Sequence, residues 1–306
     1  LSEYNLFNIE RECLAIKDSK NLDTEIIPIL GDIRDRSNLE HVFQKFSIDQ
    51  IYHAAAYKHV PIVENENNIS KAAENNILGT YNLANSAVKH GVHSFVMIST
   101  DKAVRPTNIM GATKRFAEII IQSINSESSN TKFSMVRFGN VINSSGSVIP
   151  LFIDQISRGG PITVTHKDVM RYFMTIPEAS NLVLQAGEMS SGGEVFILDM
   201  GEQVKIFDLA RKLIHLSGRN HADGDEVDGI EIVEVGLRPG EKMYEELLIS
   251  GSELKTENPK IYKATESFIE PKILKPLLAE LKESIVSFDN KKILTLLSQH
   301  VEGFNR

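Results

Sequence analysis

The chain has 306 residues, of which 42% are hydrophobic and 24% charged, a composition typical of a globular protein with one large or two modest domains. Its net charge of −8, with no basic patch, argues against a nucleic-acid partner, and no apolar run approaches the roughly 20 residues of a membrane span. Cys13 stands alone, which excludes an internal disulfide and fits a reducing cytoplasm.

The first half of the chain alternates short apolar strands with helices. The pattern predicts strands at 25–30, 50–53, 94–99 and 133–137, and helices at 38–46, 69–89 and from Met110 to about Asn125. Such alternation implies a parallel sheet with helices on both faces, a doubly wound α/β fold.

The rhythm changes after residue 140. Helices are predicted at 149–156, 178–188, 207–216, 271–288 and 291–300, strands at 162–165, 194–198 and 230–235, and an acidic loop at 221–229. We expect residues 1–140 plus about 171–203 to form the sheet domain. Residues 141–170 plus 204–306 are expected to form a smaller α/β domain that binds the substrate.

Polar residues follow the strand at 94–99. Thr100, Asp101 and Lys102 fall at its carboxyl end, where open α/β sheets bind ligands. Met110 and Lys114 are four residues apart on the next helix, so they share a face and can point back toward the strand end. The sequence therefore predicts a functional site at this edge of the sheet.

This layout resembles the extended short-chain dehydrogenase/reductase superfamily, with Met110 at the Tyr position of the family's Tyr-x-x-x-Lys helix. It is most similar to the UDP-N-acetylglucosamine 4,6-dehydratases of bacterial surface-polysaccharide and protein-glycosylation pathways. The segments 53–61, 137–141 and 238–242 fit the same pattern, so the resemblance covers nearly the whole chain. It implies a Rossmann-type sheet and a C-terminal domain that binds a nucleotide sugar.

The chain begins part-way through the family pattern, since residues 1–6 resemble the segment that follows the family's second strand. By the resemblance, the first strand, the glycine-rich phosphate loop and the acidic residue that binds the adenosine ribose should lie upstream. We expect the molecule to contain them, because a sheet without its central strand would expose a large apolar gap. Some family members also carry upstream membrane-spanning segments, which would attach the cytoplasmic protein to the inner membrane.

The resemblance implies a tightly bound and recycled NAD or NADP, with NAD slightly preferred. Asp32 would accept a hydrogen bond from the adenine amino group; the alternative is a loop carboxylate that caps the following helix. Three consecutive alanines let the backbone approach the pyrophosphate and ribose. Asn76 would distort its helix near the cofactor. The implied cofactor-binding residues are Asp32, Ile33, Ala54, Ala55, Ala56, Asn76, Ser99 and Lys114.

Dehydration of a hexose across C5 and C6 requires oxidation at C4, a base for the C5 proton, an acid for the C6 hydroxyl and a hydride returned to C6. The resemblance assigns Lys102 as the base, Asp101 as the acid and Lys114 to the nicotinamide ribose. The first two roles require a neutral lysine and a protonated aspartic acid, which burial against a sugar favours. The Met110 thioether cannot accept the C4 proton, so Thr100, Asp101 or a water must; in the family this Met accompanies retention at C5.

The expected substrate is UDP-N-acetylglucosamine. Arginine recognises diphosphates through a planar fork, and Arg238, beside a rigid Pro-Gly turn, is a better candidate than Arg171. We interpret His59 as structural, and the scattered histidines lack metal-ligand spacing, so no metal is predicted. The implied substrate-binding residues are Lys58, Asn140, Arg171, Arg238 and Glu241.

Two alternatives remain open. The first is a nucleotide-sugar 4-epimerase or a dehydratase of another sugar. An epimerase needs only reversible hydride transfer at C4 and would leave Asp101 and Lys102 idle. A catalytically silent binding protein would suit Met110 but would not need the polar set. By analogy with the superfamily we expect a homo-oligomer, with the 69–89 helix and the Met110 helix in a four-helix interface. No membrane contact is expected from this chain.

Overall fold

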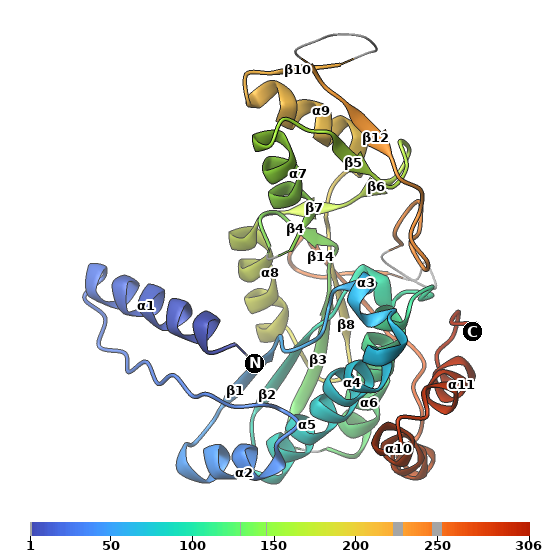
Figure 1. Cartoon of the computed structure of the whole chain (residues 1–306). Helices are drawn as coiled ribbons and strands as arrows, with labels where there is room; N and C mark the ends of the chain where they lie inside the picture. Colours follow the sequence, from blue (N-terminus) through green and yellow to red (C-terminus); the bar gives the residue numbers. More distant parts are fainter. Residues whose placement is uncertain (1, 129, 145, 223–228, 247–252) are drawn as a thin grey trace.

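A computed structural model describes residues 2–128, 130–144, 146–222, 229–246 and 253–306 (Figure 1). In this part of the chain the main sheet has the order β1 (Gln50–His53), β2 (Ser94–Ile98), β3 (Lys132–Arg137), β8 (Val195–Leu198), β14 (Ile261–Ala264), β13 (Leu254–Lys255). Strands β1, β2, β3 and β8 are parallel, whereas β14 and β13 run antiparallel to their neighbours. The predicted parallel α/β sheet is confirmed.

Helices cover both faces of this sheet, as predicted. Helices α5 (Thr80–Lys89) and α6 (Ile109–Glu127) pack on one face and α8 (Ile176–Glu188) on the other (Figure 1). The alternation of side chains along β2 serves both layers: Phe95 lies in the α5–α6 core, and the next residue, Val96, lies in the α8 core. Strand β2 is therefore buried on both sides, and its end is fixed rigidly.

The predicted strand at 25–30 is wrong. These residues pair with no strand in the described part of the chain, and Leu30 is 58% exposed. A run of apolar residues becomes a strand only when a neighbour completes its hydrogen bonds, and β1 forms the edge of the sheet here. Helix α1 (Glu3–Ser19) precedes this segment and buries none of its residues, while α2 (Arg36–Lys45) follows it.

The predicted 69–89 helix is divided by a π-helical segment. Helix α4 (Ile69–Ala73) leads into η2 (Glu74–Gly79), which continues as α5. Asn76 lies in η2 and is 1% exposed. The predicted distortion of the helix at Asn76 is confirmed.

A second, smaller core lies beyond the sheet. Helices α7 (Val148–Ser157) and α9 (Ile206–Leu216) pack against β5 (Ile162–Val164) and β12 (Ile232–Glu234), with Phe152, Ile162 and Ile214 at the centre. These elements fall within the ranges of the predicted second domain up to about residue 235, and the domain's role in binding a substrate stays a prediction. Residues 223–228, most of the predicted acidic loop, lie outside the described residues.

The C-terminal part of that predicted domain is placed elsewhere. Strands β13 and β14 extend the main sheet, and helices α10 (Pro271–Val286) and α11 (Asn290–His300) pack on α4 and α6 (Figure 1). Leu281 and Leu297 are fully buried there in one cluster with Phe116 of α6. The face that the superfamily analogy reserves for a four-helix dimer interface is thus covered by helices of the same chain.

Short elements complete the described chain. They are α3 (Val60–Val63), η1 (Glu66–Asn68), η3 (Asp101–Ala103), β4 (Asn140–Val141), β6 (Met170–Arg171), β7 (Phe173–Met174), β9 (Val204–Lys205), β10 (Asn220–His221) and β11 (Gly229–Ile230). The pairs β4–β7 and β6–β9 connect the main sheet to the smaller core.

Candidate active site

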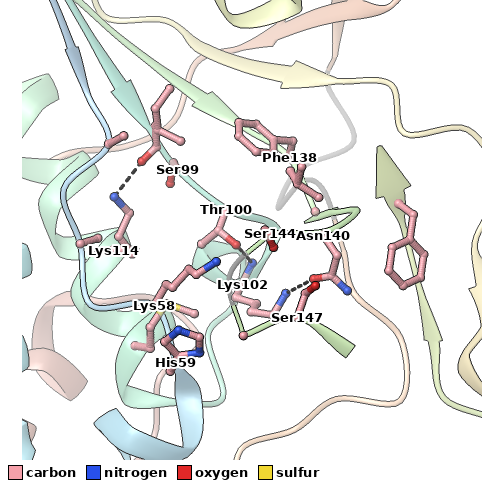
Figure 2. Close-up of a pocket in the computed structure, with 18 of the residues that line it drawn as sticks. Lys58, His59, Ser99, Thr100, Lys102, Lys114, Phe138, Asn140, Ser144 and Ser147 are labelled. Atoms are coloured by element: carbon pink, nitrogen blue, oxygen red, sulfur yellow. Dashed lines mark hydrogen bonds between the residues drawn. The ribbon is translucent and has the colours of Figure 1, made fainter. Parts of the chain in front are cut away.

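A cavity of about 330 Å³ opens at the carboxyl ends of β1, β2 and β3 (Figure 2). Parallel strands place their carboxyl ends at one edge of the sheet, so residues distant in sequence meet here. The predicted site residues that line it are Ala54, Ala56, Lys58, Ser99, Thr100, Lys102, Lys114 and Asn140. Figure 2 shows Lys58, Lys102 and Lys114 arranged around one space.

Thr100, Asp101 and Lys102 form one hydrogen-bonded group. The Thr100 hydroxyl caps the short η3 helix and donates to Asp101 Oδ1 at 2.9 Å. Lys102 Nζ donates to the same oxygen at 2.9 Å and to Asn140 Oδ1 at 3.3 Å. Asp101 is fully buried, and its Oδ2 has no hydrogen-bond partner in the described part of the chain.

The charge state of Lys102 differs from the expectation. Burial alone would lower the pKa of Lys102, but the carboxylates of Asp101 and Glu245 outweigh it, so the pKa lies above its ordinary value. In the absence of a ligand Lys102 is therefore a charged ammonium, because two carboxylates face it. A base role requires Lys102 first to lose this proton.

Lys114 is buried on α6 and directed at the end of β2. Its Nζ donates to the carbonyl oxygen of Ile98 at 2.7 Å (Figure 2). Burial lowers the pKa of Lys114 to about 8, and the nearby Glu118 carboxylate opposes this shift. Met110, one turn earlier, is 4% exposed, packs in the apolar core and lines the cavity.

A buried ion network supports the floor of the cavity. The Ser99 hydroxyl donates to Glu118 Oε1, which also accepts from Arg137 Nε at 2.8 Å. Arg137 makes two further bonds to Glu266 at 2.6 and 2.7 Å, and Arg115 bonds Glu118 at 3.0 Å. The two arginines and two glutamates offset one another's burial, so the network is a rigid support for Ser99.

Asn76 supports the cavity without lining it. Its side-chain oxygen accepts from the Tyr57 backbone N–H at 2.8 Å, and its amide donates to the Tyr57 carbonyl at 3.1 Å and to Thr113 Oγ1 at 3.0 Å. These bonds fix the segment after β1, which carries the cavity-lining Lys58. The predicted contact between Asn76 and a cofactor stays a prediction.

Asp32 and Ile33 do not line the cavity. Asp32 is paired with Arg34 at 2.6 Å, and this hydrogen bond lowers the pKa of Asp32 to about 2. The predicted contact between Asp32 and adenine stays a prediction. The helix-capping alternative is wrong, because Asp35 is the residue that caps α2. Ile33 lies against Gly79, where an added Cβ would be 2.7 Å from its side chain.

Three predicted diphosphate ligands lie together outside the cavity lining. Arg171 is buried and bonds Glu241 Oε1 at 3.1 Å and the Met170 carbonyl at 2.7 Å. Arg238 is exposed, and its backbone N–H donates to Glu241 Oε2 at 3.2 Å. Their contact with a substrate stays a prediction, and in this structure Glu241 already engages the guanidinium of Arg171.

Sequence reasoning missed one wall of the cavity. Ser144, Gly146, Ser147 and Val148 line it where α7 begins, and His59, interpreted above as structural, lines it too. The N-terminus of a helix presents free N–H groups and favours anions. The signal was present in the sequence, since a Ser-Gly-Ser run before an apolar stretch is typical of a helix start.

The residues present fit a dinucleotide cofactor at the β1–β2 side of the cavity. Ala54 and Ala56 have short side chains that leave the backbone open to it, and Lys114 lies opposite. Within the described ranges, no group of three or more His, Cys, Asp or Glu side chains is placed so that it could hold a metal ion. None of the described helices is both long and apolar enough to cross a membrane.

The sequence matches known proteins over most of its length. Residues 1–266 match the family model described as "Polysaccharide biosynthesis protein". The chain belongs to this family. It lies within the extended short-chain dehydrogenase/reductase superfamily, as the resemblance implied.

Three relatives show the range of activities assigned within this group. The chain is 54% identical to "Capsular polysaccharide biosynthesis protein CapD" of Staphylococcus aureus, over 80% of this chain and 39% of CapD. It is 36% identical to a UDP-glucose 4-epimerase of Rickettsia canadensis, over 75% of this chain and 64% of the relative. It is 33% identical to the inverting UDP-N-acetylglucosamine 4,6-dehydratase of Campylobacter jejuni, over 72% and 62%. The chain thus spans less than two thirds of each of these relatives.

Solved structures share the fold. Pen from Bacillus thuringiensis superposes with a TM-score of 0.74 at 34% identity, covering 92% of this chain and 88% of Pen. The dTDP-glucose 4,6-dehydratase DesIV from Streptomyces venezuelae, solved with NAD bound, gives a TM-score of 0.59 at 22% identity, covering 71% and 69%. The Rossmann-like α/β fold is therefore shown.

Proposed function

We propose that the protein is an NAD(P)-dependent 4,6-dehydratase of UDP-N-acetylglucosamine. The observation that carries the proposal is the Thr100–Asp101–Lys102 group beside the cavity, with both polar side chains bonded to Asp101 Oδ1. A dehydratase needs an acid at the C6 oxygen and a base at C5 of one sugar, and an epimerase needs neither of these two groups. A relative at 33% identity, the inverting UDP-N-acetylglucosamine 4,6-dehydratase, supports the dehydration but not the retention at C5 proposed below.

The C4 proton has a route through Thr100. Met110 cannot accept it, whereas the Thr100 hydroxyl lines the cavity and donates to Asp101 Oδ1. As Thr100 takes the proton of the C4 hydroxyl it passes its own to Asp101, which becomes the acid that protonates the leaving C6 oxygen. The water that departs from C6 therefore carries the proton that Thr100 passed to Asp101, and the C4 proton replaces it on Thr100.

Asp101 gives the C6 oxygen the proton that it receives on Oδ1, the atom to which Thr100 and Lys102 both donate. Its other oxygen, Oδ2, is buried and has no hydrogen-bond partner in the described residues. A Cβ at Gly139 would be 2.9 Å from Oδ2, so the missing side chain leaves room for the carboxyl group.

Lys102 takes the C5 proton and returns it. It must begin neutral, so its ammonium loses a proton to solvent before the sugar reacts. Return of the proton from the same nitrogen gives retention at C5. The nicotinamide cofactor, when bound, removes hydride from C4 and delivers it to C6; Lys114 and the backbone at Ala54 and Ala56 would hold it.

The proposal is tested with UDP-N-acetylglucosamine and mass spectrometry. The wild-type protein should convert it to a product lighter by one water. Asp101→Asn and Lys102→Ala should each lower kcat by roughly 10²–10⁴-fold, while KM changes far less. Near-normal turnover of either variant would remove that residue from the mechanism.

A 4-epimerase is the second candidate, because a relative of that activity is 36% identical. The same assay separates the two. An epimerase would give a product of unchanged mass, and its rate would survive Lys102→Ala. A silent binding protein would bind the nucleotide sugar and produce neither change.

A further inference from the structure

We infer that Glu245 is a positioning residue for Lys102: it holds the ammonium in place and stabilises the charge that Lys102 acquires when it takes a proton. The inference rests on the proposed function of Lys102 as the C5 base. Glu245 comes from the second half of the chain, 143 positions after Lys102. Its contacts were not anticipated from the sequence.

The segment from Gly240 to Glu246 is bonded to the loop that follows η3. The Gly240 carbonyl accepts from Thr107 Oγ1 at 2.8 Å. Lys242 Nζ donates to the Val104 carbonyl at 3.0 Å. These bonds fix the segment's backbone relative to the loop that follows η3, so Glu245 is held at a set distance from Lys102.

Glu245 lies between two cations. Its Oε1 is 3.9 Å from Lys102 Nζ and 3.8 Å from Arg171 Nε. The residue is 6% exposed, and its own carbonyl accepts from Gln203 Nε2 at 3.2 Å. Its Oε2 is buried with no hydrogen-bond partner in the described residues. A buried carboxylate so placed acts mainly through its charge on the two cations.

The groups that face Glu245 are Lys102, Asp101, Arg171 and Lys242. Burial raises the pKa of Glu245, the three cations oppose this, and Asp101 adds to it. Arg171 offsets the second carboxylate, so Glu245 does not leave the site with unbalanced negative charge. When Lys102 takes a proton, a positive charge develops between Asp101 and Glu245, and both carboxylates stabilise it.

The charge effect is measured directly by the pH dependence of Lys102 labelling with an amine-reactive reagent, read by peptide mass spectrometry. Only the neutral amine reacts, so a lower pKa speeds labelling at fixed pH. In Glu245→Gln the pKa of Lys102 should fall, which accelerates labelling at pH 8 by about tenfold or more. Lys58, which lines the same cavity, is the internal reference and should keep its rate.

The catalytic effect is measured on the same variant. The acidic limb of the kcat profile should move to lower pH, and the maximal rate of deuterium exchange at C5 should fall about tenfold, since the charged form of Lys102 is less stabilised. Glu245→Asp should recover part of both effects. Glu246→Gln is the control for a neighbouring carboxylate: it removes partly exposed pairs with Arg105 and Lys242 and should leave the position of the limb unchanged.

The outcomes separate this inference from the proposed function. If the wild-type protein dehydrates its substrate but Glu245→Gln changes neither labelling nor the pH profile, the inference is overturned and the function stands. If the wild-type protein loses no water from any nucleotide sugar, the function fails, and the labelling result alone decides whether Glu245 sets the charge of Lys102.

Discussion

Met110 and Lys114 lie on one face of α6, but their side chains have different environments. Met110 fills apolar space beside the cavity, whereas Lys114 is buried with its ammonium on the Ile98 carbonyl. A thioether and an isobutyl group have similar volume, so the apolar contact is replaceable. The buried amine has no apolar substitute, because its removal leaves the Ile98 carbonyl without that donor.

Met110→Leu should therefore cost little activity, and less than about 1.5 kcal/mol in unfolding free energy. Lys114→Ala should lower turnover severely, because it removes positive charge at the expected nicotinamide site. Turnover of both variants at saturating cofactor is the measurement. Equal loss in the two would mean that the thioether has a role other than filling space and would rule out the Thr100 route.

His53 gives a prediction about pH. It is buried on β1 with Nε2 2.8 Å from Thr80 Oγ1, and burial, with a contribution from Lys114, lowers the pKa of His53 to about 3. The unfolded chain binds this proton near pH 6.5 and the folded chain does not. The free energy of unfolding should thus decrease as pH falls from about 6.5 toward about 3, with a contribution approaching one proton.

The check is denaturant unfolding as a function of pH for the wild type and for His53→Gln. The variant should lose that part of the slope between about pH 6.5 and pH 3 while acid-sensitive carboxylates keep theirs. His41, on the surface-facing helix α2, offers His41→Gln as a control that leaves the slope in place. Equal slopes in the wild type and His53→Gln would mean that the folded chain binds the His53 proton over the same pH range as the unfolded chain.

At the scale of single residues, the sequence predicted which side chains lie at the end of β2, and it predicted few of the contacts made by distant residues. Thr100, Lys102 and Lys114 line the cavity as expected, because a strand and the helix that follows it fix their directions locally. The charge of Lys102 was not predictable, since it depends on Glu245, which only the tertiary structure brings near. For the same reason Arg171 was assigned to a substrate when its guanidinium has a partner in the chain.

At the scale of helices and strands, α6 and the short helix η3 lie in unusually close contact. A Cβ at Gly111 would lie 2.1 Å from the Lys102 carbonyl oxygen, a backbone atom that cannot move away alone. Glycine here sets the distance between the helix and the turn. The position of Lys102 therefore depends on a residue that itself has no polar side chain.

Gly111→Ala should displace η3 and lower turnover by about tenfold or more, because misplacing a reacting group by an ångström is costly. Helix propensity alone would favour the alanine by about 1 kcal/mol, so a gain in stability with normal turnover would contradict the argument. Glu127→Ala at the exposed end of the same helix is the control. Turnover and thermal unfolding measured on both variants decide between the effects.

The bounds of helices were predictable from the sequence, because their hydrogen bonds are internal. A strand was predictable only where a neighbouring strand pairs with it. Helices α7, α8 and α9 agree with the expected ranges within one or two residues, since caps and periodicity specify them locally. The segment 25–30 carries the same apolar signal as a strand, but no paired neighbour lies beside it in the described structure. Strand identity is a property of the pair, which one segment's sequence does not contain.

At the scale of the whole molecule, helices α10 and α11 stabilise the face of the sheet domain that α4 and α6 form. Helices α10 and α11 bury Leu281 and Leu297 against α4 and α6. The sequence showed that each terminal helix has an apolar face but not what covers it. That is why these helices were assigned to the wrong domain: amphipathicity reveals burial, not the partner.

Leu281→Ala should lower the free energy of unfolding by about 2–5 kcal/mol, because it opens a cavity in a fully buried cluster. Ile273→Ala on the same helix, where the side chain is half exposed, should cost less than about 1 kcal/mol. Denaturant unfolding measures both. Similar small costs for the two would mean that α10 is not packed on the sheet domain in solution.

The π-helical segment η2 has a consequence for how this helix tolerates changes in length. Each i→i+5 ring contains one residue more than an α-helical ring, so the helix before η2 is rotated by about 100° relative to a continuous helix. Deletion of Leu78 would let hydrogen bonding become regular, and the helix by itself would improve. Yet Asn76 would then turn away from Tyr57, and the segment that carries Lys58 would lose its anchor. In this chain, a shorter and more regular helix would be the less functional one.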